Sequence, residues 1–270
     1  MGQLARRYRK ALVTGPSSGL GLAFTEMLLA EGLSVVGLSR RPELAGADKS
    51  YFPVICDLSN QTAVAKTLDE VFAQHPDLDL VINNAGFGLL SELPKMSDMQ
   101  IEAQYGVMLV APTLIAKRAL QAFRDADVSG CVVNVSSLAA ELPIPLMPVY
   151  NACKAGLRGL SESLNLDASG LSSKTVVIDF RPGDFCTPFA DRMEGETDWA
   201  GVDLRAVMAR HHAEAPSVET AVDGLRRALL RGRPGRVRVG DFFQAKVAPL
   251  GPKLLPSGWL RALIRLYYKN

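Results

Sequence analysis

Residues 14–21 of this 270-residue chain read TGPSSGLG, and this stretch decides the fold. It directly follows a short apolar run at residues 11–14 and leads into a helical pattern at residues 20–31. Glycines at this junction let the backbone approach a pyrophosphate, because side chains would hold it away. The helix N-terminus beyond supplies free N–H groups and a partial positive charge. Any tight strand-to-helix turn favours glycine, so the phosphate-binding interpretation depends on where the turn stands in the chain.

The rest of the chain repeats the same alternation of strand and helix. Uninterrupted apolar runs, typical of strands buried on both faces of a parallel sheet, occupy residues 11–14, 34–38, 51–56, 80–83, 131–135, 175–180 and 236–239. Helical patterns lie at residues 20–31, 62–74, 97–123, 149–168 and 217–231, and Ser59 or Asn60 is expected to cap the second. This alternation predicts βαβ crossovers and a doubly wound α/β sheet. No repeat or linker divides the chain, so we expect one domain over residues 1–270.

Composition and charge exclude several classes of protein. Apolar residues make up 48% and charged residues 21%, which is enough for a core and excludes a disordered or collagen-like chain. The net charge of +2 is too small to indicate a nucleic-acid partner. Cys56, Cys131, Cys153 and Cys186 share no CxxC or metal-ligand spacing, so we expect reduced thiols and no metal site. Since no run resembles a signal peptide or a membrane span, we expect a soluble, cytoplasmic protein.

The end of the second predicted strand indicates which dinucleotide binds. An enzyme that uses NAD places Asp or Glu about 20 residues past the glycines, where it bonds the ribose 2′-hydroxyl. Here the strand ends in Ser39, Arg40 and Arg41. An arginine offers charge-assisted hydrogen bonds to a 2′-phosphate, which a carboxylate would repel. The alternative is a basic surface loop. We predict NADP(H) rather than NAD(H), with Arg40 ahead of Arg41 as the ligand.

Two further segments suit a cofactor crevice at the ends of strands. Asp57 and Leu58 follow the third predicted strand, where a carboxylate could accept a hydrogen bond from an adenine amino group. Asp57 could equally cap a helix. Residues 83–86 read NNAG and end the fourth strand, where small residues let the backbone pass beneath a cofactor. A simple turn is the alternative. The predicted contacts here are Asp57, Leu58, Asn84, Ala85 and Gly86.

A candidate proton-transfer pair opens the helical pattern at residues 149–168. Tyr150 and Lys154 are four residues apart and share one helix face. A phenol has a pKa near 10, and an ammonium one turn away stabilises its anion. Ser137, at the end of the fifth predicted strand, could donate a hydrogen bond to a carbonyl oxygen as negative charge develops on it. Because the Tyr-x-x-x-Lys spacing is common by chance, its weight comes from the glycine-rich turn and the serine that precede it.

Taken together, these motifs resemble the short-chain dehydrogenase/reductase family over residues 8–190 or so. The resemblance implies a Rossmann fold, a three-layer parallel sheet of about seven strands, and a homodimer or homotetramer. It implies Tyr150 as general acid/base, Lys154 lowering its pKa and holding the nicotinamide ribose, and Ser137 orienting the substrate carbonyl. Residues 182–187 resemble the segment that passes the nicotinamide carboxamide. The full set of predicted cofactor contacts is Gly15, Ser17, Ser18, Gly19, Leu20, Gly21, Ser39, Arg40, Arg41, Asp57, Leu58, Asn84, Ala85, Gly86, Tyr150, Lys154, Pro182, Gly183 and Thr187.

One position departs from the family pattern. Many members carry an asparagine in the fourth helix, and Met108 aligns best with that place. A thioether cannot anchor the water through which a proton relay would run. We therefore expect either a relay through Lys154 and a differently held water or a slower turnover. The roles of Ser137, Tyr150 and Lys154 are unaffected.

The region after the cofactor motifs resembles the family's mobile substrate lid, at residues 187–216. Met193, Trp199 and Met208 within it favour a partly apolar substrate, although these side chains could instead pack the lid down. His211 and His212 have no third metal ligand at a suitable spacing. We expect both histidines on a solvated helix face.

The C-terminal segment, residues 242–270, is basic and amphipathic. It contains no Asp or Glu, and apolar side chains after residue 258 lie largely on one side of a predicted helix. Such a segment could contact an anionic membrane, cover the mouth of the active site or pack against another subunit. Its five basic residues are Lys246, Lys253, Arg261, Arg265 and Lys269.

The combined prediction is an NADP(H)-dependent oxidoreductase that interconverts a carbonyl and a secondary alcohol by hydride transfer. A medium-sized lipophilic ketone or a 3-oxoacyl compound is the expected substrate. One alternative is an NADP-binding regulatory protein without significant turnover, which Met108 favours. The other is a membrane-surface reductase of a lipid ketone, which the basic C-terminal segment favours.

Overall fold

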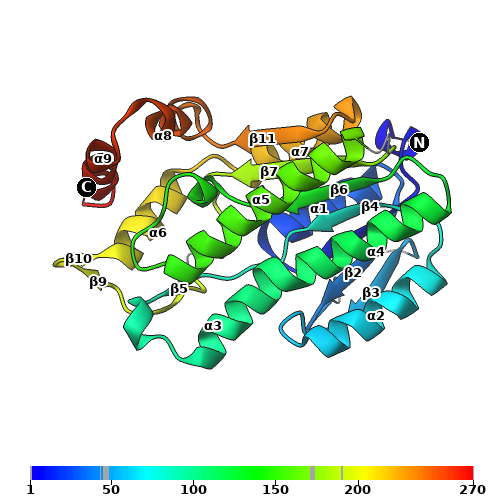
Figure 1. Cartoon of the computed structure of the whole chain (residues 1–270), viewed down its shortest axis with the longest axis horizontal. Coiled ribbons are helices and arrows are strands. Elements are labelled where there is room, and N and C mark those ends of the chain that lie inside the picture. Colours follow the sequence, from blue (N-terminus) through cyan, green and yellow to red (C-terminus); the bar gives the residue numbers. More distant parts are fainter. Residues whose placement is uncertain (1, 43, 45–48, 171–173, 190, 270) are drawn as a thin grey trace.

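A central sheet of seven parallel strands organises the computed structural model, which describes residues 2–42, 44, 49–170, 174–189 and 191–269 (Figure 1). Residue 190 of the predicted lid lies outside the described residues. The strands run in the order β11-β7-β6-β4-β1-β2-β3, so the chain winds outward in both directions from β1 and β4. Their bounds are β1 (Lys10–Thr14), β2 (Ser34–Ser39), β3 (Tyr51–Ile55), β4 (Leu78–Asn83), β6 (Cys131–Val135), β7 (Val176–Pro182) and β11 (Gly235–Val239).

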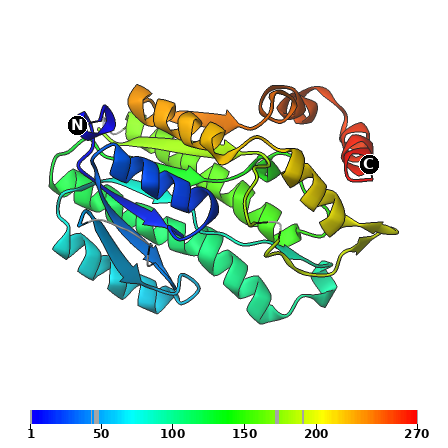
Figure 2. The same cartoon turned by 180° about the vertical axis from the view of Figure 1, so that it is seen from behind.

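The central strands are buried because helices cover both faces of the sheet. Every residue of β4 and β6 is buried, which explains their uninterrupted apolar sequences. One layer contains α1 (Gly19–Ala30) and α7 (Val218–Arg231), which contact each other. The other contains α2 (Gln61–Gln74), α4 (Ala111–Asp125) and α5 (Pro148–Gly170) (Figures 1 and 2). The predicted three-layer fold and its seven strands are confirmed.

Caps define where the helices begin. The Asn60 side chain accepts a hydrogen bond of 3.0 Å from the Ala63 N–H, so Asn60 rather than Ser59 caps α2. The single helix expected at residues 97–123 is divided into α3 (Asp98–Tyr105), a π-helical turn at Gly106–Val110, and α4. A π-turn inserts a wider loop into a helix and is frequent at functional sites. Here it carries Met108, the residue at the departing family position.

The continuous helical stretch Asp98–Asp125 is long and apolar enough to cross a membrane by length and composition alone. A core helix of a soluble protein passes the same test. Ile115, Ala119 and Phe123 form the apolar face of its second half, and all three are buried in the cluster between sheet and helices. Packing in the core therefore accounts for the apolar face of the second half of this stretch.

Several elements were not anticipated. The predicted lid contains α6 (Leu204–Glu214) and the short strands β8 (Glu194–Gly195), β9 (Asp198–Trp199) and β10 (Val202–Asp203). Strand β8 pairs with β5 (Leu89–Leu90), which fastens the lid to the body of the protein. Short 3-10 turns lie at Leu4–Arg6, Leu93–Lys95, Leu138–Ala140 and Ala248–Leu250. The C-terminal segment contains a π-turn at Phe243–Val247 and α8 (Gly251–Leu254), which precede α9 (Ser257–Tyr267), the helix predicted after residue 258.

A buried ionic network fastens β7 to its neighbours. The Arg181 side chain is fully buried, and its Nε donates a 2.7 Å hydrogen bond to Asp179. Its guanidinium also pairs with Glu141, which Arg238 of β11 binds at 2.8 Å. Since buried charges are stable only when paired, each member of this network depends on the others.

Replacing Arg181 by alanine is expected to lower the free energy of unfolding by about 3–5 kcal/mol, because Asp179 would stay buried without its cation. Urea unfolding measures this loss. The control is Arg118→Ala, which removes an ion pair with Asp69 between half-exposed side chains and is expected to cost less than about 1 kcal/mol. Equal losses in the two variants would contradict the role given to the network.

Candidate active site

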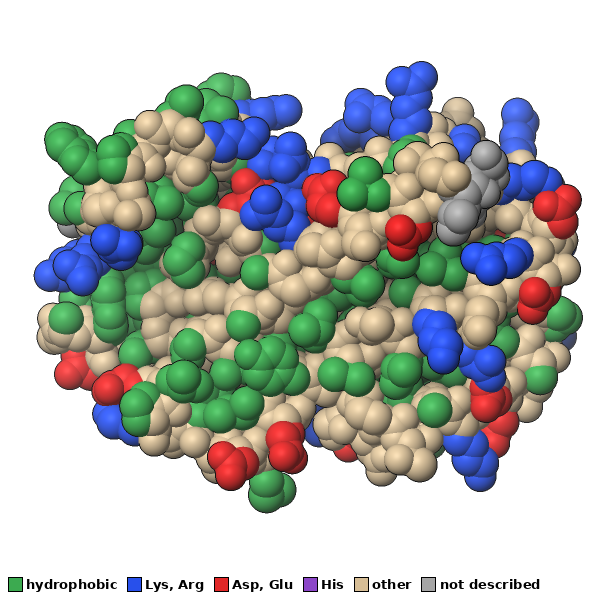
Figure 3. Space-filling model, in the orientation of Figure 1, with side chains coloured by type: hydrophobic (Ala, Val, Ile, Leu, Met, Phe, Trp, Pro, Cys, Tyr) green, Lys and Arg blue, Asp and Glu red, His purple; other side chains and the backbone are tan. Residues whose placement is uncertain are grey.

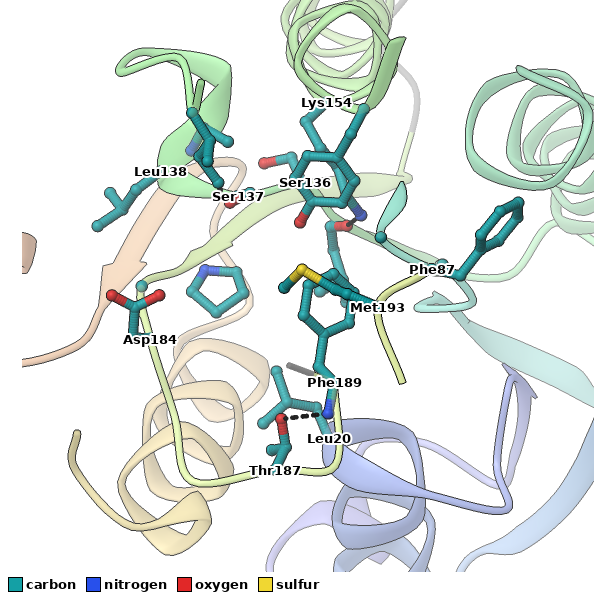
Figure 4. Close-up of a pocket in the computed structure, with 18 of the residues that line it drawn as sticks. Leu20, Phe87, Ser136, Ser137, Leu138, Lys154, Asp184, Thr187, Phe189 and Met193 are labelled. Carbon is teal, nitrogen blue, oxygen red and sulfur yellow. Dashed lines mark hydrogen bonds between the residues drawn. The ribbon is translucent and has the colours of Figure 1, made fainter. Parts of the chain in front are cut away.

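A cavity of about 1440 Å³ opens at the carboxyl ends of the parallel strands. Pockets for single small molecules usually measure about 300–1,000 Å³, so this one has room for a dinucleotide and a second molecule. It lies where β1 and β4 lead the chain in opposite directions, the usual place for ligands in doubly wound sheets. Figure 4 shows part of its wall, with Ser136, Ser137 and Lys154 on one side and Leu20, Thr187 and Phe189 on another.

The glycine-rich turn has the geometry of a phosphate cradle. Gly15 and Gly19 have φ values of +67° and +54°, which side chains disfavour. At Gly19, the nearest atom to an added Cβ would be Thr187 Cβ at 3.7 Å, an ordinary van der Waals contact. Gly21 is different because its Cβ would lie 2.0 Å from the Gly15 oxygen, behind the turn. All the predicted cofactor contacts line the cavity except Gly21, which packs α1 against the turn instead.

Asn84 joins the ends of β1 and β4 beneath the cavity. Its backbone N–H donates to Thr14 Oγ1 at 2.9 Å, and its side-chain amide donates to the Thr14 carbonyl at 3.1 Å. The Ala85 N–H donates to the same hydroxyl at 2.9 Å. An added Cβ at Gly15 would meet Ala85 Cα at 3.2 Å, so the two loops touch. The small residues of this segment thus form a floor on which a flat ligand can lie.

The far end of the cavity carries the basic group expected for a 2′-phosphate. Arg40 and Arg41 are exposed on its rim, and neither guanidinium has a hydrogen-bond or ion-pair partner in the part of the chain that the structure describes. Asp57 accepts hydrogen bonds from the Ser59 N–H at 2.9 Å and from the Ser59 hydroxyl at 2.8 Å. The hydrogen bond from the Ser59 N–H is the main cause that lowers the pKa of Asp57, and the charge of Arg40 lowers it further. Asp57 therefore shapes a local turn while it also lines the cavity.

The three predicted catalytic residues converge on one wall. Tyr150 and Lys154 occupy the first turns of α5, and both are buried. Lys154 Nζ donates a 2.9 Å hydrogen bond to the Val135 carbonyl and lies 5.5 Å from the centre of the Tyr150 ring. Ser137 follows β6, and its hydroxyl accepts a hydrogen bond from the Ala139 N–H at 3.0 Å. This geometry brings a phenol, an ammonium and a hydroxyl to one side of the cavity.

Burial is the main cause of the shifted pKa values of Tyr150 and Lys154. It raises the pKa of Tyr150 to about 12, an effect that a hydrogen bond with Ser137 offsets only in part. Burial also lowers the pKa of Lys154 to about 8. Lys154 Nζ lies 5.5 Å from the centre of the Tyr150 ring and donates to the Val135 carbonyl, so the lowering of the Tyr150 pKa by Lys154 stays a prediction. A phenol with a pKa this far above neutrality keeps its proton at neutral pH.

Met108 is the residue that the sequence pattern aligns with the family's asparagine. Its side chain is fully buried among apolar neighbours that include Tyr150 and Cys153. An added Cβ at Gly86 would lie 3.3 Å from Met108 Sδ and 3.6 Å from Lys154 Nζ, so the thioether ends beside the ammonium. A thioether is a weak acceptor and has no hydrogen to donate. A relay of protons therefore cannot pass through this side chain.

The lid is folded over the cavity. The Phe189 ring lies 5.9 Å from the Tyr150 ring, and Arg192 Nη1 donates a 3.0 Å hydrogen bond to Ser18 in the glycine-rich turn. The expectation of a solvated face for His212 is wrong: its side chain is only 11% exposed and lines the cavity. The reason is that α6 turns the face with Leu204 and Met208 inward, and His212 continues that face one turn later.

The C-terminal segment lies over the mouth of the cavity. This is the second of the three alternatives named above, next to contact with a membrane and packing against another subunit. Its lining side chains are mainly apolar and come from the π-turn, α8 and α9. Gln244 fastens the segment to the body of the protein through hydrogen bonds with Asp184. Figure 3 shows apolar side chains exposed between basic ones at the end of the molecule that carries α9.

Sequence reasoning missed one cluster of the site. Asp184 from the loop after β7, His212 from α6 and Gln244 from the C-terminal segment meet in the cavity. The available signal was the position of Asp184, which directly follows Pro182 and Gly183 and so had to face the same crevice. The contributions of His212 and Gln244 depend on how the lid and the C-terminal segment fold back, which no local pattern records.

Comparisons with known proteins place the chain in a family. The family model for short chain dehydrogenase matches residues 9–197. A 3-ketodihydrosphingosine reductase of Bacteroides thetaiotaomicron is 27% identical over 95% of this chain and 97% of its own length. The 15-hydroxyprostaglandin dehydrogenase [NAD(+)] of Mus musculus is 30% identical over 69% of this chain and 71% of its own. A short-chain dehydrogenase from Streptomyces avermitilis has a similar fold, with a TM-score of 0.77, 24% identity and 97% coverage of both chains. Solved neighbours include complexes with NADH, with NADP+ and with NADPH.

Proposed function

The chain belongs to the short-chain dehydrogenase/reductase family, an oxidoreductase family that acts on CH–OH and C=O groups, and on this premise we propose that it is an NADP(H)-dependent reductase of a lipophilic ketone. The observation that carries the proposal is the placement of Tyr150 and Ser137 beside Lys154 on one wall of a cavity whose other end carries Arg40 and Arg41. A dinucleotide that spans these two ends would bring its nicotinamide to the phenol.

The proposed reaction needs only a few groups of the chain. A nicotinamide held by Tyr150 and Lys154 would supply the hydride that the carbonyl carbon accepts. Tyr150 donates its proton to the carbonyl oxygen, which becomes the alcohol. Ser137 donates a hydrogen bond to the same oxygen as negative charge develops there. Lys154 stabilises the resulting phenolate through its charge, and solvent then returns a proton to Tyr150.

The residues present fit NADP(H) at the other end as well. The positive φ values of Gly15 and Gly19 form a turn that would let the N–H groups at the N-terminus of α1 approach a pyrophosphate. Arg40 and Arg41, whose guanidiniums have no partner among the described residues, suit a 2′-phosphate, and β2 ends without the carboxylate that would select a 2′-hydroxyl. These features support NADP(H) over NAD(H), although one of the relatives above is named for NAD+.

The apolar wall supports a lipophilic ketone as substrate. Side chains from the lid and the C-terminal segment surround the space in front of Tyr150, including Phe189, Met193, Leu260 and Ile264. The Bacteroides relative, which matches nearly the full chain, is named for a lipid ketone. A screen of NADPH consumption with straight-chain ketones tests the proposal: kcat/KM should rise as the chain lengthens, and no consumption with any of them would contradict it.

The composition of the C-terminal segment supports the proposal that this reductase binds to a membrane surface. Of the fourteen large hydrophobic side chains described as exposed, eight belong to residues 242–266, and Trp259 is 71% exposed. The whole C-terminal segment, residues 242–270, contains five basic residues and no acidic one. Exposed apolar side chains among cations complement an anionic lipid surface. Because the same segment covers the cavity, binding of the segment to a membrane would place the mouth of the cavity at the lipid surface.

The intact protein is expected to sediment with vesicles that contain phosphatidylserine and to leave pure phosphatidylcholine vesicles in solution. Lys253→Glu/Arg261→Glu/Arg265→Glu should abolish sedimentation, because each cation near an anionic surface contributes about 1 kcal/mol. The control, Lys66→Glu/Lys117→Glu/Arg124→Glu, makes the same change of charge on exposed residues of α2 and α4. Equal losses in both variants, or a dimer in solution that buries Trp259, would contradict the proposal.

A further inference from the structure

Four lysine and arginine side chains line the cavity in the described part of the chain, and three of them already have proposed roles. Lys154 lies beside the Tyr150 ring, and Arg40 and Arg41 lie on the rim at the other end. The fourth is Arg192, an exposed residue of the lid. NADP(H) carries a pyrophosphate in addition to its 2′-phosphate, and the roles proposed so far leave that pyrophosphate without a cationic side chain.

The side chain of Arg192 reaches from the lid to the glycine-rich turn. Its Nη1 donates a 3.0 Å hydrogen bond to the Ser18 hydroxyl. Asp191 and Glu194 are exposed neighbours in the lid, but Arg192 forms an ion pair with neither of them, nor with any other acid among the described residues. A guanidinium has five N–H donors, so Arg192 keeps donors and a positive charge for an anion at this turn.

The start of α1 leaves donors free at the same turn. Ser18 is the N-cap residue of α1, yet its side chain forms no capping hydrogen bond with the helix. At the start of α2, by contrast, the Asn60 side chain accepts a hydrogen bond from the Ala63 N–H. The hydroxyl of Ser18 accepts from Arg192 and can donate its own hydrogen to a ligand. Backbone N–H groups, a hydroxyl and a guanidinium therefore meet here, and all three kinds of group bind phosphate oxygens.

Packing on both sides of Arg192 holds its backbone next to the turn. Met193 is 2% exposed, and an added Cβ at Gly88 would lie 2.8 Å from Met193 Cγ, so this side chain needs the glycine opposite it. On the other side, Thr187 contacts the turn at Gly19. Figure 4 shows Thr187 and Met193 on either side of Phe189 in this segment. The lid therefore directs the exposed side chain of Arg192 toward the turn.

We propose that Arg192 is a cofactor-binding residue that pairs with the pyrophosphate of the dinucleotide, so that the bound cofactor holds the lid against the glycine-rich turn. This rests on the proposed function and adds the lid to the cofactor site. Because Phe189 of the same segment lies 5.9 Å from the Tyr150 ring, a lid held in this way also fixes the wall beside the phenol. NADPH and NADH both carry the pyrophosphate, so Arg192 should contribute to the binding of both, whereas Arg40 should contribute to NADPH alone.

Fluorescence titration of Arg192→Gln with each cofactor tests the proposal. Glutamine can still donate to Ser18 but has no charge, so NADPH and NADH should both bind more weakly, by the same factor of about fivefold or more. Binding of adenosine 2′-monophosphate, which lacks the pyrophosphate, should stay within about twofold, because no charge-assisted bond to it is lost. The control is Arg205→Ala, which removes a lid arginine that donates to the Gly195 carbonyl at 3.2 Å and lies outside the cavity lining. It should change none of these dissociation constants.

Weaker binding of NADPH alone in Arg192→Gln would assign this arginine to the 2′-phosphate and overturn the proposal. Equal losses for all three ligands would assign it a structural role and overturn the proposal as well.

A second measurement follows the lid without any turnover. Hydrogen exchange of the backbone amides at residues 191–203, measured by mass spectrometry, should slow by about tenfold or more when the intact protein is saturated with NADP+. Arg192→Gln, saturated to the same extent, should lose most of this protection. Both results without turnover of any ketone would support the role of Arg192 and overturn the reductase function alone. Ketone turnover together with unchanged NADPH and NADH affinities in Arg192→Gln would overturn the role of Arg192 alone.

Discussion

Replacing Tyr150 by phenylalanine is expected to lower kcat for ketone reduction by about 10²–10⁴-fold, the usual contribution of a positioned general acid. The ring of Phe keeps the contact with Phe189, so packing should be preserved. The proton that the carbonyl oxygen requires would then have to come from water. KM should change little because the phenol acts mainly on the reacting oxygen. Steady-state kinetics with NADPH measures both constants.

The control for this variant is Tyr105→Phe, which removes a hydroxyl from a partly buried tyrosine of α3 outside the cavity lining. It should leave kcat within about twofold of the intact protein. A Tyr150→Phe variant that binds NADPH normally and reduces ketones at nearly the original rate would exclude Tyr150 as the proton donor.

Arg40→Ala is expected to weaken NADPH binding by about 10–100-fold and to leave NADH binding nearly unchanged. The reason is that hydrogen bonds to a charged group contribute about 1.5–3 kcal/mol, and only NADPH carries the 2′-phosphate that the guanidinium would bind. Fluorescence titration with each cofactor measures the two dissociation constants. Arg41→Ala should have the smaller effect, in keeping with the order predicted from the sequence.

The matched control for the cofactor experiment is Arg124→Ala, which removes an exposed arginine near the end of α4. It should alter neither dissociation constant. If Arg40→Ala weakened NADPH and NADH equally, the arginine would contribute to the general shape of the site, and the 2′-phosphate role would be wrong.

Much of the fold could be predicted because it is encoded locally. Buried parallel strands require uninterrupted apolar runs such as residues 131–135, and the turn at Gly15 and Gly19 requires positive φ. Both features are visible in single segments. The same is true of Tyr150 and Lys154, because one helix face fixes their relation without any tertiary information.

The remaining features depend on contacts between distant segments. The π-turn at Gly106–Val110 interrupts a pattern that reads as one helix. His212 has a polar sequence environment, yet α6 turns it toward the cavity. The hydrogen bonds between Asp184 and Gln244 join residues sixty positions apart. The protonation of Tyr150 is set by burial, which the spacing of Tyr and Lys does not reveal.

Transfer of deuterium from the cofactor tests the central claim most directly. The intact protein is incubated with NADPH that carries deuterium at both positions of nicotinamide C4, together with long-chain ketones, and the products are analysed by mass spectrometry. The account predicts a secondary alcohol with one deuterium on the carbinol carbon and one equivalent of NADP+ per alcohol. Stoichiometric binding of NADPH without any deuterated alcohol would contradict it and would support a regulatory NADP-binding protein instead.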